Sequence, residues 1–290
     1  MKYEGMIIRP PSEAYSLLLQ VTVGCSHNLC TFCETYKGKK FRIKSLDEIG
    51  EDIKEASRYR QVERVFLCDG DALIIPQEKL KNIIRMIKSE IHGVQRISTY
   101  GNAKSALRKS VEELTELREL GLTMVYLGVE TGSEELLRKI CKGVTVSQTI
   151  EAGRRIKQAG MTLSVTVILG LGGIEKSTEH ALETARVLTA IDPDYVGALT
   201  LMIIPGTPIY EDYRAGKLPQ PDQFGYLREL SLIISHAEFT DCFFTANHAS
   251  NYLPIRAKLP QDKEKIVDMI NRIITSADKS ILRPEYLRAL

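Results

Sequence analysis

The sequence contains no tryptophan, no large excess of charge of either sign and no long apolar run. Among its 290 residues, 39 are Lys or Arg and 37 are Asp or Glu, which gives a formal net charge of +2. A domain that binds nucleic acid strongly normally has a basic excess gathered on one face. The charge balance is compatible only with a local basic groove, so we expect no nucleic-acid partner. The lack of tryptophan has no functional meaning.

Signals for membranes and secretion are also lacking. No apolar run approaches the roughly 18 residues of a membrane helix, and the first 19 residues have neither the apolar core nor the cleavage site of a secretory signal. Of six cysteines, three are clustered, whereas Cys68, Cys141 and Cys242 are scattered. This spacing favours thiols in a reducing compartment over three disulfides. We therefore predict a cytoplasmic protein with no membrane partner.

The most informative stretch is VTVGCSHNLCTFC, from Val21 to Cys33. An apolar strand leads into a loop with three cysteines, Cys25, Cys30 and Cys33, spaced C-x4-C-x2-C. Three thiolates make an incomplete shell for zinc or for an iron-sulfur cluster, because both usually take four ligands. His27 lies within the loop, but a histidine at a loop tip more often faces solvent or bonds the backbone. The loop therefore predicts a metal centre with one open coordination position.

Apolar strands alternate with helical stretches along most of the chain. The expected strands are residues 17–23, 62–68, 94–99, 123–129, 162–169 and 195–201. Ser45 with Glu48, and Ser110 with Glu113, form capping boxes at the starts of two helices. This alternation predicts successive βαβ units and a parallel sheet, either doubly wound or curled into a full or partial barrel. Both architectures place chemistry at the carboxyl ends of the strands.

Polar or glycine-rich loops follow these strands. They are Asp69-Gly70-Asp71, Tyr100-Gly101-Asn102, Glu130 to Ser133 and Gly170 to Gly173. The two aspartates are explained equally well by a turn around Gly70 and by ligand contact. The Gly170 loop lacks the Lys-Ser/Thr of a P-loop, so we interpret it as close backbone approach to a ligand.

Two charged features have a structural interpretation beside a functional one. The basic stretch Lys37–Lys44 fits a solvated surface ribbon better than contact with an anionic ligand. Glu130 fits a charge near a helix N-terminus, although a functional role is slightly favoured.

These motifs together resemble the radical S-adenosylmethionine (radical SAM) superfamily. The resemblance is carried by the cysteine loop, Asp69-Gly70-Asp71, VYLGVETGSEELLRKICKG at 125–143, VILGLGG at 167–173 and IPGTPIYED at 204–212. It covers residues 17–216 and is nearest to the branch with oxygen-independent coproporphyrinogen oxidases and tRNA methylthiotransferases. The commonest family spacing is C-x3-C-x2-C, so the extra residue in the first gap leaves the subgroup open.

The resemblance implies an α/β fold, a partial (β/α)6 TIM-like barrel with a C-terminal extension. The implied division is an N-terminal segment (1–16), a core barrel (17–204) and an extension over the barrel mouth (205–290). Cys25, Cys30 and Cys33 would hold a 4Fe-4S cluster whose fourth iron binds S-adenosylmethionine. One electron from the cluster would then cleave the cofactor to a 5'-deoxyadenosyl radical, which abstracts hydrogen from a substrate.

The resemblance also implies cofactor-binding residues. Gly70 and Asp71 match the segment that meets the methionine amino group, and Phe32 lies against the adenine. Further implied contacts, to the nucleotide or the methionine carboxylate, are Asn102, Glu130, Lys142, Thr166, Gly170 and Gly172. For Lys142 a solvated helix-end position is at least as good an interpretation.

Residues 205–290 lose the strand-helix alternation and contain a polar cluster beside an aromatic run. Its members, Asn247, His248, Asn251 and Tyr252, are either substrate contacts or a polar loop with local turns.

Substrate and partners follow mainly by elimination. No cobalamin-binding domain and no second cysteine trio are evident. A small-molecule substrate is therefore preferred, together with a low-potential electron donor such as flavodoxin or ferredoxin. The oligomeric state is open. The alternatives are an iron-sulfur electron-transfer or redox-sensing protein without radical chemistry, and a structural zinc module.

Overall fold

The computed structural model describes residues 1–59 and 61–289, which form two compact units. The first unit comprises Met1–Asn28, Thr35–Leu127 and Glu151–Leu163. The second comprises Leu29–Glu34, Gly128–Ile150 and Ser164–Leu290.

The first unit is a parallel α/β structure. Its strands are β1 (Leu17–Gln20), β4 (Arg64–Cys68), β5 (Arg96–Gly101) and the start of β6 (Leu122–Glu130), hydrogen-bonded in that order. A separate antiparallel pair is formed by β2 (Thr22–Val23) and β3 (Arg42–Ile43). Its helices are α1 (Leu46–Ala56), α2 (Gln77–Glu90), α3 (Ala103–Leu107), α4 (Val111–Leu120) and the short 3-10 turns η1 (Pro11–Glu13) and η2 (Ala72–Ile74). This arrangement confirms the predicted βαβ repeats.

Helix starts in this unit follow the side chains that can satisfy unpaired backbone amides. Ser45 and Glu48 form a reciprocal capping box at α1, and Ser110 and Glu113 form a second at α4, both as predicted. Helix α4 ends at Gly121, whose φ of 118° lies in the left-handed region where a Cβ is disfavoured.

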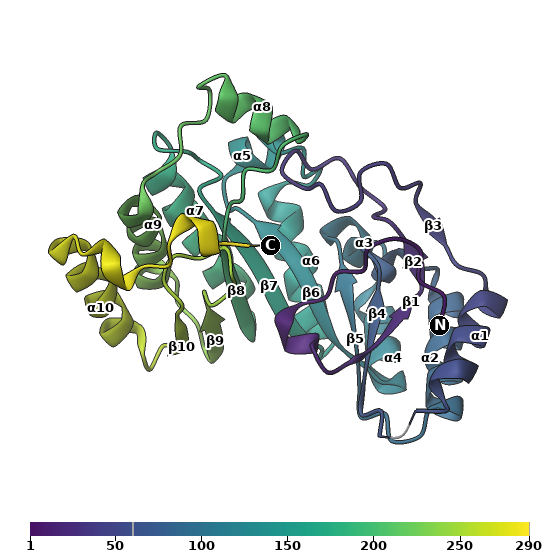
Figure 1. Ribbon diagram of the computed structural model, residues 1–290. Coiled ribbons are helices and arrows are strands. Elements are labelled where there is room, and N and C mark those ends of the chain that lie inside the picture. The colour runs from purple at the N-terminus through teal and green to yellow at the C-terminus, as the bar shows by residue number, and fades with distance from the viewer. Residues whose placement is uncertain (60, 290) are drawn as a thin grey trace. The chain divides into compact units, whose positions relative to one another are not determined.

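One face of the first unit's strands is covered by the N-terminal segment. Phe66, Cys68, Met124 and Tyr126 form an apolar cluster there, and Ile7 packs against it. At η1 the buried Glu13 carboxylate accepts hydrogen bonds from Arg96 on β5 (2.7 Å) and from Tyr126 on β6 (2.6 Å). Figure 1 shows this segment crossing in front of β5, with α2 and α4 on the other face. The strand face is therefore closed by the chain's own residues.

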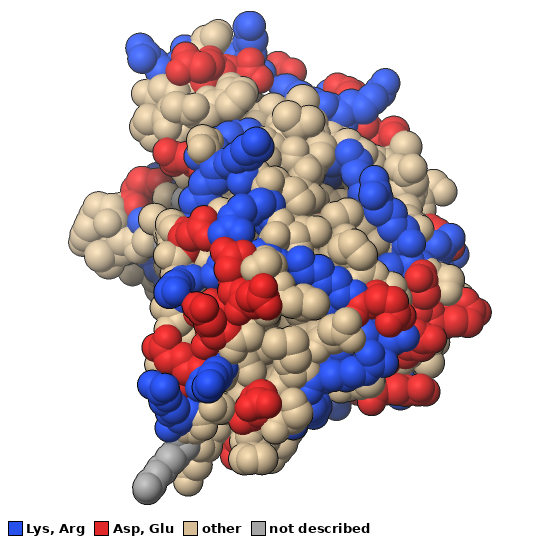
Figure 2. Space-filling model, turned by 90° about the vertical axis from the view of Figure 1, so that its right-hand side faces the viewer, with Lys and Arg blue, Asp and Glu red and all other residues tan. Residues whose placement is uncertain are grey.

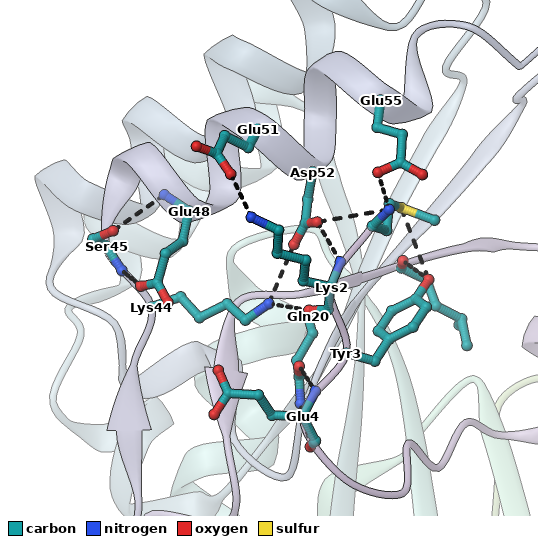
Figure 3. Close-up of polar contacts among 12 residues, drawn as sticks. Lys2, Tyr3, Glu4, Gln20, Lys44, Ser45, Glu48, Glu51, Asp52 and Glu55 are labelled. Carbon is teal, nitrogen blue, oxygen red and sulfur yellow. Dashed lines mark hydrogen bonds and ion pairs between the residues drawn. The ribbon is translucent and has the colours of Figure 1, made fainter.

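The basic stretch differs from its expected solvated form at one end. Lys44 is buried, donates to the backbone oxygen of Lys2 (2.6 Å) and forms an ion pair with Asp52 on α1 (3.2 Å). Figure 3 shows Lys44 and Asp52 directed toward one another beside Lys2. Lys44 therefore joins β3 to α1 instead of facing solvent. Elsewhere Lys and Arg are mixed with Asp and Glu over the face in Figure 2.

The second unit contains β7 (Thr162–Leu169) from its third residue onward, β8 (Tyr195–Thr200), β9 (Cys242–Thr245) and β10 (Arg256–Leu259). Strands β7, β8 and β9 are parallel, and β10 runs antiparallel to β9 at the edge. Its helical elements are α5 (Glu134–Lys139), the start of α6 (Val146–Gln158), α7 (Ser177–Ile191), α8 (Pro208–Arg214), α9 (Gln223–His236), α10 (Lys263–Ser276) and the 3-10 turns η3 (Lys279–Ile281) and η4 (Glu285–Leu287). Helix α9 packs between α7 and α10.

The six predicted strands correspond to β1, β4, β5, β6, β7 and β8, and the α/β class is confirmed. Strands β9 and β10 were not expected, because each has only four residues and the alternating pattern had faded there. No helix in the described part of the chain is both long enough and apolar enough to span a membrane. The division into segment, barrel and extension stays a prediction.

Candidate active site

The cysteine loop follows β2 through Gly24, whose φ is 74°. Cys25, Cys30 and Cys33 are half-buried thiols. In the second unit, Cys33 N–H donates to Cys30 O (3.3 Å) in a tight turn, and Thr31 is held by backbone bonds with Ile140 and Ile209. These bonds fix the loop's backbone without using the thiols.

In the first unit Gly70 lies directly against the cysteine loop. A Cβ at this position would be 2.8 Å from the Cβ of Cys25 and 2.7 Å from the Tyr36 ring. Real Cβ atoms do not approach so closely, and therefore only glycine allows this packing. The contact explains the glycine by its neighbours, and its predicted contact with the methionine amino group stays a prediction.

The two aspartates after β4 also hold this region. Asp69 accepts a hydrogen bond from Gly24 N–H (3.2 Å), and burial raises the pKa of its carboxyl above the ordinary value. Asp71 is fully buried and accepts from the hydroxyls of Ser26 and Ser105 and from Asn102 N–H (3.3 Å). Burial raises the pKa of Asp71 against the opposing effect of these bonds. Asp71 therefore joins the cysteine loop to the loop after β5.

Asn102 has a capping role in the same loop. Its side-chain oxygen accepts from Lys104 N–H (3.0 Å) at the start of α3. His27 Nδ1 lies 3.3 Å from Lys104 Nζ, so the histidine of the cysteine loop contacts the ammonium group of Lys104.

In the second unit Glu130 and Lys142 form a buried ion pair. Lys142 Nζ lies 2.6 Å from Glu130 Oε1, and the two side chains are 9% and 10% exposed. Glu130 has a φ of 65°, a left-handed conformation that is rare outside glycine and turns its side chain at the end of β6. A Cβ at Gly128 would be 2.3 Å from Glu130 Oε1, so glycine leaves the room that this pair occupies. The solvated position considered for Lys142 is not the one observed.

The loop after β7 is held closely by its neighbours. Gly170 has a φ of 88°, and its N–H donates to Glu229 Oε1 (2.7 Å) on α9. A Cβ there would be 2.5 Å from the Tyr226 ring, and one at Gly172 would be 2.9 Å from Lys176 O. Thr166 is half-buried on β7, opposite Gly197 on β8. Contacts with protein groups therefore explain the glycines at 170 and 172, and the predicted approach of their backbone to a ligand stays a prediction.

Phe32 packs against an apolar cluster in the second unit. Its members are Leu136, Ile140, Ile168, Leu171, Leu201, Ile209 and Leu218. These residues come from α5 and its C-cap, the end of β7, α8 and the loops that follow β7, β8 and α8.

Comparison with known proteins decides the family. Residues 19–185, more than half of the chain, match the model of the Radical SAM superfamily. The chain belongs to the radical SAM superfamily. Members of this family use a 4Fe-4S cluster and S-adenosylmethionine, and these are the cofactors of this radical SAM enzyme.

Relatives agree with the branch expected from the motifs. The heme chaperone HemW of Bacillus subtilis is 24% identical over 74% of this chain and 58% of its own length. A tRNA-2-methylthio-N(6)-dimethylallyladenosine synthase of Sulfurihydrogenibium sp. is 23% identical over 67% of this chain and 45% of its own. This radical SAM chain thus spans only about half the length of these curated relatives.

A solved structure shows the same fold. Coproporphyrinogen III oxidase (HemN) from Escherichia coli aligns with a TM-score of 0.56 and 18% identity, over 74% of this chain and 51% of that one. At this identity the likeness concerns architecture alone, and it confirms the expected TIM-like α/β class.

The donor set of the cysteine loop fits the family's cluster. Thiolates are the ligands of iron-sulfur clusters, and three of them leave one iron for an external ligand. Among residues 1–59 and 61–289, no three His, Cys, Asp or Glu side chains are already gathered as a metal site. The assignment of these cysteines as ligands therefore rests on the loop's sequence and on the family.

The loop of the predicted substrate contacts is held mainly by the radical SAM chain's C-terminal residues. Arg283 donates to the backbone oxygens of residues 248, 249 and 251, and Arg288 donates to Ser250 O (2.6 Å). Arg288 also lies over the Tyr252 ring at 4.4 Å and donates to its hydroxyl (2.7 Å). In Figure 1 the segment after α10 is the yellow end of the chain.

The four polar residues themselves differ in what they contact. Asn251 is 2% exposed and bonds Ala198 O (2.8 Å) and the Thr200 hydroxyl (2.8 Å) on β8. Asn247, with its amide oxygen turned to Arg256, accepts two bonds of 3.1 and 3.2 Å. His248 is half-buried. Its burial is the main cause of a lowered pKa, and the positive charge of Arg283 lowers the pKa further. Asn251 and Tyr252 thus shape the loop from within.

No recognisable sequence motif marks His180, Glu229, Arg283 or Arg288. Apart from Thr184, four residues from His180, the partners of His180 and Glu229 lie 12 to 59 residues away along the chain. Only the folded chain brings these groups to the strand-end loops.

Proposed function

We propose that the protein reductively cleaves S-adenosylmethionine and uses the resulting 5'-deoxyadenosyl radical to abstract hydrogen from a small-molecule substrate. The observation that carries this proposal is the C-x4-C-x2-C loop inside the segment that matches the Radical SAM superfamily. Cys25, Cys30 and Cys33 would hold a 4Fe-4S cluster, which when bound supplies the electron for cleavage and an iron for the cofactor's amino and carboxylate groups.

The first unit's contribution is to hold the cysteine loop. Asp71 bonds Ser26, Asp69 bonds Gly24, and Gly70 admits Cys25 at close range. These contacts act on residues before, at and after Cys25. The loop's position is therefore fixed before any ligand arrives, which lowers the entropic cost of binding.

The second unit would supply the nucleotide and carboxylate contacts. Lys142 is a buried cation whose partner is Glu130, so a methionine carboxylate would share that ammonium with Glu130. We propose that Thr166, Gly170 and Gly172 line the nucleotide, as in the family's strand-end loops. Phe32 would present the edge of its apolar cluster to the adenine.

The substrate and the electron donor belong to the same proposal. We propose that His248 and Asn247 contact the substrate, while Asn251 and Tyr252 keep their loop in shape. A flavodoxin or ferredoxin would supply the electron.

Anaerobic reconstitution tests the proposal. The purified chain is loaded with iron and sulfide, its iron content is measured, and it is reduced with dithionite in the presence of S-adenosylmethionine. We expect about four irons per chain and formation of 5'-deoxyadenosine. The matched control is Cys242→Ala, because Cys242 is a buried thiol on β9, whereas Cys30→Ala should lose both readouts. A loaded wild-type chain that forms no 5'-deoxyadenosine would contradict the radical function and favour electron transfer alone.

A further inference from the structure

A buried imidazole and a buried carboxylate connect two strand-end loops of the second unit. His180 on α7 and Glu229 on α9 are both 0% exposed. His180 Nδ1 lies 2.8 Å from the hydroxyl of Thr131 in the loop after β6, and its Nε2 lies 3.3 Å from Glu229 Oε1. The same Glu229 oxygen accepts the N–H of Gly170 in the loop after β7 (2.7 Å). The pair therefore joins both loops.

The acceptors around the ring determine the direction of these bonds. Nε2 faces two acceptors, Glu229 Oε1 and Ile168 O (3.1 Å), so it carries a proton. The Thr131 hydroxyl accepts from Ser133 N–H (3.0 Å), and in neutral His180 it donates to Nδ1. Polar contacts thus run from the Ser133 amide through Thr131, His180 and Glu229 to the Gly170 amide. All are hydrogen bonds except the 3.3 Å contact between His180 Nε2 and Glu229, because Ile168 O accepts the hydrogen bond recorded for Nε2.

Neighbouring contacts prevent either loop from moving independently of α7 and α9. The N–H of Gly132 donates to the Thr184 hydroxyl on α7 (3.0 Å), and a Cβ at Gly132 would be 2.1 Å from Glu183 O. Ser177 at the start of α7 donates to Glu229 Oε2 (2.6 Å). The carboxylate therefore accepts two hydrogen bonds, from Gly170 and Ser177, and has the imidazole of His180 as a third polar neighbour.

We propose that His180 and Glu229 are positioning residues that set the spacing of the loops at 130–133 and 170–173 for the nucleotide of S-adenosylmethionine. This inference rests on the proposed function, in which both loops contact that cofactor. Neither side chain reaches solvent, so each acts through the backbone amides that it orders. Because His180 contacts the loop at 130–133, Glu229 bonds the loop at 170–173, and the two side chains contact each other, disturbing either residue should loosen both loops together.

The test compares Glu229→Gln and His180→Gln with His236→Gln, an exposed histidine on the same helix as Glu229. Glutamine keeps the length of Glu229 but places an amide donor where donors already converge. At position 180, glutamine keeps a donor near the place of Nε2 and removes the acceptor Nδ1. Should the buried variants fail to fold, Ser177→Ala is a milder variant, since it removes only one of the two hydrogen bonds that the carboxylate accepts.

Hydrogen exchange of the chain without cofactors is the first readout. Peptides covering 128–134 and 168–176 should both exchange about tenfold faster in each buried variant, a loss of about 1.4 kcal/mol of local protection. Ser177→Ala should accelerate both peptides by a smaller factor. Faster exchange in only one loop, or in neither, would overturn the coupling.

Cofactor affinity of the cluster-loaded protein is the second readout. In Glu229→Gln and His180→Gln, the dissociation constant and the KM for S-adenosylmethionine should rise about tenfold, or about 1.4 kcal/mol. The kcat for 5'-deoxyadenosine formation at saturating cofactor should change less than twofold. The control His236→Gln should behave as wild type. Unchanged affinity in the variants, with a wild type that binds, overturns the positioning role alone. A wild type that does not bind S-adenosylmethionine overturns the proposed function, and with it the nucleotide as the purpose of the coupling.

Discussion

At the scale of single residues, Gly70 has the sharpest steric requirement near the cysteine loop. Gly70→Ala should destabilise the protein by about 1–3 kcal/mol, because the new methyl overlaps Tyr36 and Cys25. It should also lower the iron bound after reconstitution, since Cys25 must shift. Urea unfolding and iron analysis measure both effects. The control is Gly197→Ala, where the nearest atoms are 3.9 Å away; equal losses in the two variants would contradict the steric explanation.

The Glu130–Lys142 pair predicts a non-additive pair of substitutions. Lys142→Met leaves a buried carboxylate without its cation and should cost about 3–5 kcal/mol of unfolding free energy. Adding Glu130→Gln removes that stranded charge, so the double variant should be more stable than Lys142→Met alone. Urea unfolding of the wild type, the two single variants and the double variant gives the interaction energy of the two side chains. Simple additivity would show that the two side chains do not interact.

His248 predicts a pH effect whose sign follows from its lowered pKa. Folding disfavours the charged form of His248. The contribution of this residue to the unfolding free energy is therefore fully present above the ordinary pKa of 6.5 and is lost as the pH falls below it. His248→Gln cannot titrate, and its unfolding free energy should fall less between pH 7 and pH 5 than that of the wild type. Urea unfolding at these pH values measures the difference. His236→Gln, an exposed control, should keep the wild-type slope, and equal slopes in all three proteins would refute the effect.

At the scale of elements, the C-terminal segment around η4 holds the loop at 247–252. Arg288→Lys should loosen that loop, because an ammonium cannot reproduce the planar fork that reaches Ser250 O, Leu201 O and the Tyr252 hydroxyl. Hydrogen exchange of a peptide covering 247–252 should accelerate several-fold. Arg186→Lys, at an exposed position on α7, is the control and should leave this peptide unchanged.

Elements were predictable where their cause is local. The capping boxes at Ser45 and Ser110 each need only four consecutive residues, and both helices begin as the sequence indicates. Strands β9 and β10 were missed because four residues are too few to show a period. Lys44 was expected at the surface since its partner Asp52 is recognisable only once β3 and α1 are folded.

The site shows the same division between local and distant causes. The cysteine spacing and the strand-end glycines could be recognised from the sequence, because each depends on a short motif. The roles of Asp71 and Glu229 were not, since their donors come from loops that are distant in sequence.

At the scale of the whole molecule, each unit has an apolar core of its own. The clusters around Phe66 and around Leu136 contain none of the three loop cysteines. Removing the cluster with a chelator and an oxidant should therefore abolish 5'-deoxyadenosine formation while the far-UV circular dichroism changes by less than about a tenth. Extensive loss of helix signal on cluster removal would show that the metal centre is needed for folding.

The close packing at Gly132 has a consequence for motion. The Glu183 carbonyl oxygen on α7 occupies the place that a Cβ at position 132 would take, so we expect α7 and residues 130–133 to move as one body. Arg186 lies on the exposed side of α7. A spin label attached there should therefore report the movements of residues 130–133 together with those of α7.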